Sequence, residues 1–141
     1  MILASGCGKK IEAGSPEELL SRVKEKWGTT EVMQLYTDDT VDYLKKYMKL
    51  TGMSGESAAD VLSFISPYSE YEVSGRSISG DTCTLKLRFT KQSVENLNGL
   101  VLDVKMLKEN GGWRIDRSDD FKKLVESFKS GGAENYLKSI R

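Results

Sequence analysis

The sequence contains no histidine, so the side chain that most often serves as a metal ligand, a general base or a pH switch near neutrality is absent. It also has no excess of either charge, because 21 lysines and arginines balance 21 aspartates and glutamates in 141 residues. Nucleic-acid-binding proteins usually carry a basic excess that neutralises phosphates. We therefore expect no nucleic-acid partner, no metal site and no cofactor.

Cysteines and long apolar runs are scarce. Cys7 and Cys83 are the two cysteines, and their separation fits neither a metal site nor a CxxC redox motif. Cys83 lies in a stretch of alternating apolar residues, which predicts a buried and unreactive thiol. Beyond the first residues, no apolar run approaches the ~18–20 residues that a membrane-spanning helix needs. The hydrophobic fraction of 38% and the length predict one globular domain.

The first ten residues, MILASGCGKK, differ in character from the rest. LASGC at 3–7 resembles a bacterial lipobox, in which small residues precede a cysteine that is lipidated and becomes the mature amino terminus. The apolar stretch before it is much shorter than the ~7–15 residues of a signal sequence. We interpret residues 1–14 as a truncated lipoprotein signal remnant and a polar tether, with Cys7 as the lipid-attachment site. The predicted location is the cell envelope, anchored to a bacterial membrane on its periplasmic or extracytoplasmic face.

Three helix starts follow one another in the first half of the chain. SPEE at 15–18 combines a capping serine, a proline at the first helical position and a glutamate that completes a capping box. TDDT at 37–40 offers a capping threonine or aspartate, followed by acidic residues that complement the helix dipole. Ser54 opens a third predicted helix, and Pro67 stops it.

After Pro67 the apolar period changes from 3.6 to 2 residues, which is typical of antiparallel strands. Strands are predicted at 68–79, 82–90, 100–108 and 113–117, with Gly75 as a bulge or kink. Ser118 is predicted to cap a last helix with apolar residues at helical spacing. This order predicts an α+β fold in which residues 15–141 form a single domain, with helices on one face of the sheet.

Three stretches resemble a known family. SPEELLSRVKEKW at 15–27, TDDTVDYLKKYM at 37–48 and VLDVKMLKENGGWRID at 101–116 are similar to the opening helix, the next helix and the closing hairpin of the NTF2-like superfamily. More narrowly, they resemble the small bacterial lipoproteins grouped as DUF4878-like. The resemblance implies a cone, with amino-terminal helices packed on a curved four-stranded antiparallel sheet. The carboxy-terminal helix is an addition that would cover the mouth of the cone or an open sheet face.

Five aromatic residues are candidates for lining a pocket between the helices and the sheet, and core packing is their alternative role: Trp27, Tyr43, Tyr47, Phe64 and Trp113. The acidic pairs at 38–39 and 119–120 stand at predicted helix starts, where capping and the helix dipole explain them. Asp103 alternates with apolar neighbours, and we expect it to face solvent.

No nucleophile–base pair, phosphate loop or other catalytic constellation is recognisable. The predicted function is therefore a non-catalytic binding or interaction module, anchored through Cys7, with a small molecule or an envelope protein as its partner. Its expected oligomeric state is a monomer or a weak dimer. One alternative is a small enzyme that uses Tyr43 or Tyr47 and a carboxylate as acid and base. Another is a cytoplasmic domain with a free cysteine in its amino-terminal tail.

Overall fold

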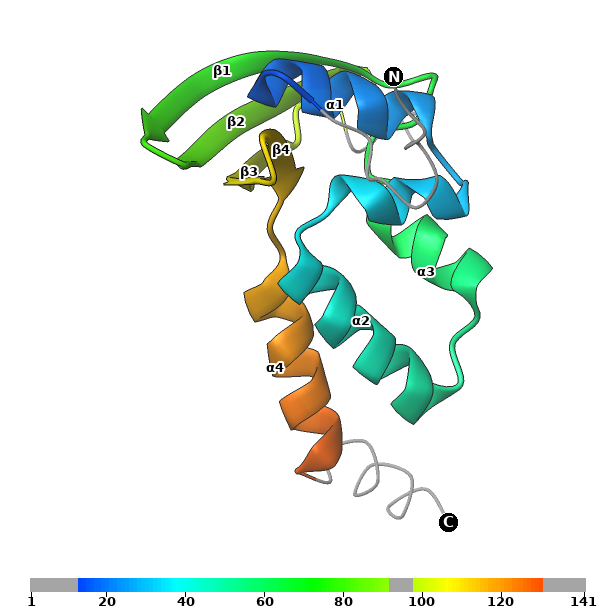
Figure 1. The fold of residues 1–141 in the computed structure, drawn as a ribbon. Helices are drawn as coiled ribbons and strands as arrows, with labels where there is room; N and C mark the ends of the chain where they lie inside the picture. The colour runs from blue at the N-terminus through cyan, green and yellow to red at the C-terminus, as the bar shows by residue number, and fades with distance from the viewer. Residues whose placement is uncertain (1–12, 92–97, 131–141) are drawn as a thin grey trace, which may run out of the picture.

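The computed structural model describes residues 13–91 and 98–130 (Figure 1). Cys7, the predicted lipid-attachment residue, lies outside the described residues, as does the rest of the segment 1–12. The elements in chain order are α1 (Pro16–Glu25), the 3-10 helix η2 (Thr30–Leu35), α2 (Asp38–Thr51), α3 (Gly55–Leu62), β1 (Glu70–Ser79), β2 (Thr82–Lys91), β3 (Val101–Glu109), β4 (Gly112–Ile115) and α4 (Ser118–Lys129). The predicted α+β class, with helices before and after a four-stranded antiparallel sheet, is confirmed.

The first helices begin at the predicted capping residues. The hydroxyls of Ser15, Thr37 and Ser54 each accept a hydrogen bond from the backbone N–H three residues later. These bonds satisfy N–H groups that a helix start would otherwise leave without a partner. Gly52 ends α2 in the left-handed conformation, with φ of 76°. For α4 the prediction was wrong, because Ser118 is the first helical residue and Arg117 precedes it without a side-chain cap.

The sheet has the order β1-β2-β3-β4, and all neighbouring strands are antiparallel. The pairing of β1 with β2 shifts between Val73 and Gly75, which confirms the predicted irregularity at Gly75. Between β3 and β4, Asn110 and Gly111 both adopt positive φ, 52° and 84°. Two such residues in succession form the tight turn whose twist matches that of a hairpin.

The core lies on one face of the sheet. Along β2, Cys83, Leu85, Leu87 and Phe89 are buried and alternate with exposed residues, so one face is covered. The same core includes Leu19, Leu20 and Val23 of α1 and Val32 and Leu35 of η2. Burial also raises the pKa of the Cys83 thiol, in agreement with the predicted unreactive cysteine.

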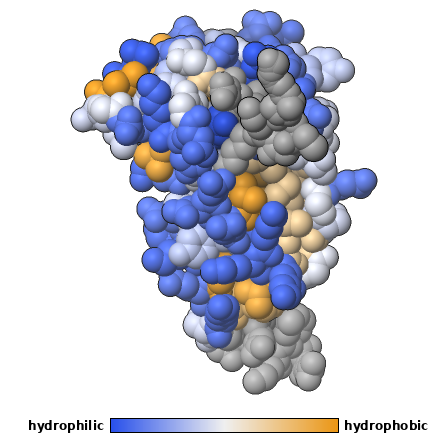
Figure 2. Space-filling model, viewed as in Figure 1, coloured by the Kyte–Doolittle hydropathy of each residue, from blue (hydrophilic) through white to orange (hydrophobic). Residues whose placement is uncertain are grey.

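The carboxy-terminal helix α4 packs on α2. Figure 1 shows these two helices side by side at one end of the molecule, with the curved sheet and α1 at the other. Phe121 and Val125 of α4 are buried, whereas Leu124 is 42% exposed. In Figure 2 the end of the molecule that contains α2 and α4 has a mainly hydrophilic surface on the visible face, interrupted by small apolar patches. Within the described residues, no helix has the length and apolar character required to cross a bilayer.

Candidate functional site

A pocket of about 390 Å³ lies where β3, the end of β4 and the first turn of α4 meet. Its volume falls within the range of about 300–1,000 Å³ that is common for small-molecule sites. The residues that line it are Phe64, Leu102, Asp103, Val104, Lys105, Ile115, Asp116, Arg117, Asp119 and Asp120. The pocket therefore combines four apolar side chains with four carboxylates and two cations.

Asp116 lies in the wall of this pocket, at the point where the chain passes from β4 to α4, and its contacts connect these elements to β3. Its backbone N–H donates to the carbonyl of Lys105 at 2.9 Å, one residue beyond the last paired residue of β4. Its Oδ1 accepts hydrogen bonds from the hydroxyl and the backbone N–H of Ser118, at 2.7 Å and 3.2 Å. Its Oδ2 lies 3.4 Å from Nζ of Lys105. The side chain of Arg117, which precedes α4, does not cap the helix, and Asp116 supplies a hydrogen-bond acceptor for the N–H of Ser118 instead.

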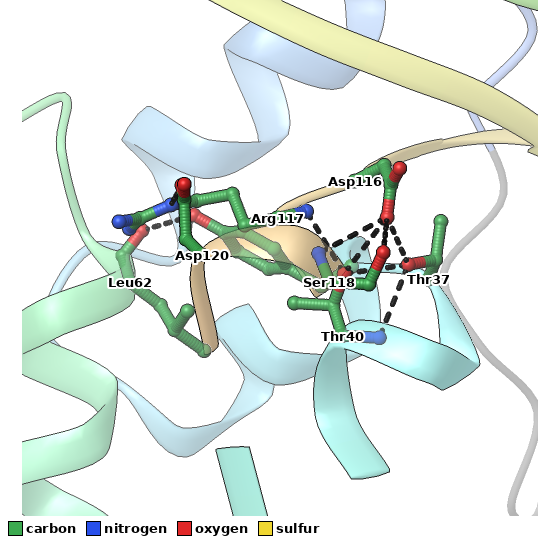
Figure 3. Close-up of polar contacts among 8 residues, drawn as sticks. Thr37, Thr40, Leu62, Asp116, Arg117, Ser118 and Asp120 are labelled. Carbon is green, nitrogen blue, oxygen red and sulfur yellow. Dashed lines mark hydrogen bonds and ion pairs between the residues drawn. The ribbon is translucent and has the colours of Figure 1, made fainter. Parts of the chain in front are cut away.

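Two threonines at the start of α2, the capping residue Thr37 and Thr40, approach the same carboxylate. The hydroxyls of Thr37 and Thr40 lie 3.2 Å and 3.3 Å from Oδ1 of Asp116, and 2.6 Å from each other (Figure 3). The hydroxyl of Thr40 also accepts the backbone N–H of Arg117 at 2.9 Å. Because each hydroxyl has one proton, one threonine donates to the other and a single proton remains for Asp116. We call Thr37, Thr40, Asp116, Arg117 and Ser118 the Asp116 cluster; it joins β4, α2 and α4.

Asp116 is held as a carboxylate. Burial of the side chain, which is 7% exposed, raises its pKa, but the hydrogen bonds from Ser118 and the charge of Lys105 outweigh that effect. The pKa of Asp116 is therefore lowered from its ordinary value of 3.8. At neutral pH the carboxylate of Asp116 accepts hydrogen bonds from the donors around it. This arrangement stabilises the structure, whereas a general acid would have to carry a proton at this pH.

The charges of the residues that line the pocket do not cancel. Arg117 forms an ion pair with Asp120, with Nε and Oδ2 3.2 Å apart, and Lys105 faces Asp116. Asp103 and Asp119 form no hydrogen bond or ion pair through their side chains within the part of the chain that the structure describes. These two carboxylates leave the pocket lining with an excess of negative charge.

A buried tyrosine lies next to the cluster. The hydroxyl of Tyr36 donates to the carbonyl of Leu62 at 2.6 Å, and the side chain is fully buried. Burial raises the pKa of Tyr36, and the nearby Arg117 offsets only part of this effect. The phenol therefore stays protonated. Because Tyr36 directly follows η2, its hydrogen bond to Leu62 ties the end of α3 to the end of η2.

Of the five aromatic residues expected to line a pocket, Phe64 lines this one. Trp27 follows α1 and is 46% exposed, and Trp113 is buried in the core with Nζ of Lys108 over its ring. Tyr43 and Tyr47 are half-buried on α2. These four residues are not part of the wall of this pocket. Trp113 belongs to the buried core and Tyr43 packs against it, as in the alternative role.

Sequence reasoning named three of the four acidic residues of the pocket, Asp103, Asp119 and Asp120, but did not predict that they line it. Asp103 is exposed, as expected, but it also lies in the pocket wall. Asp119 and Asp120 occupy the first turn of α4, as expected, and line the pocket as well. Asp116 was not singled out, because Thr37 and Thr40 are 79 and 76 residues away in the sequence.

No group of three or more Cys, Asp or Glu residues within the described ranges is arranged to hold a metal ion. Comparison with known proteins finds no matching family model, curated protein or solved structure.

Proposed function

We propose that this chain is a lipid-anchored protein of the bacterial cell envelope, whose single domain, of NTF2-like type, binds a partner without catalysis. The observation that carries the binding role is the pocket between β3 and the start of α4. The lipobox-like LASGC at 3–7 supports the anchor on Cys7, and the polar tether after it would separate the domain from the membrane.

The chemistry of the pocket wall favours binding over catalysis. A general acid or base works best with a pKa near the operating pH. The pKa of Asp116 is shifted in the opposite direction, and its oxygens face Ser118, Lys105 and the threonine hydroxyls. Arg117 is engaged by Asp120. These groups stabilise the wall and are not poised to transfer a proton.

The lining also indicates a class of ligand. Phe64, Leu102, Val104 and Ile115 provide apolar surface, and Asp103 and Asp119 provide carboxylates that no cation of the described residues neutralises. A ligand with an apolar body and a positive group matches both features, since opposite charges attract most strongly where water is partly excluded. An anion of the same shape would be repelled by these carboxylates.

Ligand-observed and amide NMR with two small probes tests this role. We expect 2-phenylethylammonium to shift the amide resonances of Phe64, Asp103 and Asp119, and 3-phenylpropionate to leave them in place. Asp103→Asn combined with Asp119→Asn is expected to weaken binding of the amine at least about tenfold, which is the effect of losing about 1.4 kcal/mol. Asp81→Asn is the matched control, because Asp81 is exposed at the turn between β1 and β2, away from the pocket. Equal binding of both probes, or no shift with the amine, would contradict the proposed ligand class.

Mass spectrometry of the native protein, purified from the membranes of cells that express its own gene, tests the anchor. We expect the mature amino terminus to be an acylated Cys7, and a Cys7→Ser variant to lose the acyl mass and leave the membrane fraction. An unmodified amino terminus at Met1 would overturn this part of the proposal.

A further inference from the structure

The strand β3 is longer than the strand that pairs with its outer edge. β3 runs from Val101 to Glu109, whereas β4 has four residues, and their pairing extends from Glu109↔Gly112 to Met106↔Ile115. Beyond this point Asp116 adds one bond to the carbonyl of Lys105, and the chain then turns into α4 (Figure 1). On this side of β3, no strand of the described residues pairs with Val101–Val104, which we call the open edge.

The register shows which backbone groups face the open edge. The carbonyl of Lys105 points towards β4, and the carbonyl of Leu100 accepts the N–H of Phe89 on the β2 side. Because successive residues of a strand direct their N–H and C=O groups to opposite edges, Asp103 and Val101 direct theirs to the open edge. An added strand would pair with these two residues and continue the line of β4.

The side chains beside the open edge fall into two kinds. On the core side, Leu102, Val104 and Phe64 belong to the apolar wall of the pocket. On the other side stand Asp103, which is exposed, and Val101, which is 51% exposed. Lys86 is the cross-strand neighbour of Asp103, but it forms no ion pair with it in the described structure. The edge therefore presents apolar contacts on one face and a carboxylate on the other.

We propose that the open edge of β3 binds an extended segment of a partner protein, in which a Lys or Arg residue lies between two apolar residues. This proposal rests on the proposed binding role of the pocket and names its partner. Alternation of side chains along a strand would place the cation beside Asp103, and the two apolar side chains over Leu102, Val104 and Phe64. Backbone pairing supplies the affinity, and charge complementarity selects the basic segment.

The test uses the 141-residue chain and the peptide acetyl-Thr-Val-Lys-Val-Thr-amide. We expect the peptide to shift the amide resonances of Val101, Leu102 and Asp103, and to bind in a titration followed by NMR. Methylation of the backbone nitrogen of its lysine removes the donor that faces β3, and we expect at least about a tenfold rise in the dissociation constant. Methylation of the nitrogen of its first valine is the matched control, because that N–H points away from β3. Replacing the lysine by glutamate is expected to abolish binding.

The outcomes separate this proposal from the binding role of the pocket. If 2-phenylethylammonium binds but the peptide does not, or if methylation at the lysine has no effect, pairing at the edge is wrong and the pocket proposal stands. If neither probe binds, both proposals fail. If the resonances of Val101–Val104 shift with protein concentration alone and a dimer sediments, the occupant is a second copy of the chain, and a basic partner segment is contradicted.

Discussion

A single carboxylate connects three elements of this protein at the residue scale. Asp116 receives hydrogen bonds from Ser118 at the start of α4 and lies within hydrogen-bond distance of Thr37 and Thr40 at the start of α2. The threonines also order each other, since the N–H of Thr40 donates to the hydroxyl of Thr37. Removing the charge of Asp116 would weaken these hydrogen bonds, because a neutral oxygen is a poorer acceptor than a carboxylate, and would remove the ion pair with Lys105.

We expect Asp116→Asn to lower the free energy of unfolding by about 1.5–3 kcal/mol, the range for hydrogen bonds to charged groups. Urea denaturation at pH 7 measures this change. Asp120→Asn is the control, because it removes an exposed ion pair with Arg117 and should change stability by less than about 1 kcal/mol. Equal losses in the two variants would show that Asp116 has no special structural role.

The same residue predicts a dependence on pH. The pKa of Asp116 is lowered on folding, so its contribution is fully present above the ordinary value of 3.8 and is lost as the pH falls through the lower folded value. The difference in stability between the wild type and Asp116→Asn should therefore be constant from pH 7 to pH 5 and shrink below pH 3.8. Denaturation curves across this range measure it, and a difference that grows on acidification would contradict the lowered pKa.

At the scale of the elements, the sequence was sufficient to predict the features that depend on residues close together in the chain. The caps of α1, α2 and α3 and the alternation along β2 depend on residues within one turn or one strand. The length of β4 was overestimated, since WRIDR at 113–117 continues the strand pattern. The strand ends at Ile115, and Asp116 adds only one backbone hydrogen bond to β3. Asp116 and Arg117 also have partners at the start of α2, and a contact across more than 70 residues leaves no periodic signal in the sequence.

The turn between β3 and β4 gives a test at this scale. Gly111 has φ of 84°, and a Cβ added there would meet no atom within 4 Å, so any cost of Gly111→Ala comes from the backbone conformation. We expect a loss of about 1–2 kcal/mol, the cost of a left-handed conformation for a residue with a Cβ. Gly55→Ala is the control, because Gly55 has equally open surroundings and begins α3 without positive φ. It should be neutral or stabilise by up to about 1 kcal/mol in urea denaturation. A neutral Gly111→Ala would contradict a conformational requirement for glycine.

For the whole molecule, the arrangement predicts two regions of different local stability. β2 is paired on both sides and covers the core, whereas α4 packs on α2 and is tied to the sheet through the Asp116 cluster. A fold class can be inferred from the order of helices and strands, but the position of α4 depends on which partner its apolar stripe meets. The sequence pattern shows the stripe and not the partner.

Substitution of one buried residue of α4 tests this division. Phe121 is 1% exposed, so Phe121→Leu should weaken the contact of α4 with α2 by about 1 kcal/mol while keeping an apolar side chain there. Hydrogen exchange should then become faster for the amides of α4 and α2, while those of β2 keep their rates, because regions with fewer buried contacts open independently. Leu124→Ala is the control, since Leu124 is 42% exposed and its truncation should leave all rates nearly unchanged. Equal acceleration in β2 and α4 would mean that the molecule opens as one cooperative unit, and the binding surface between β3 and α4 would then be as stable as the core.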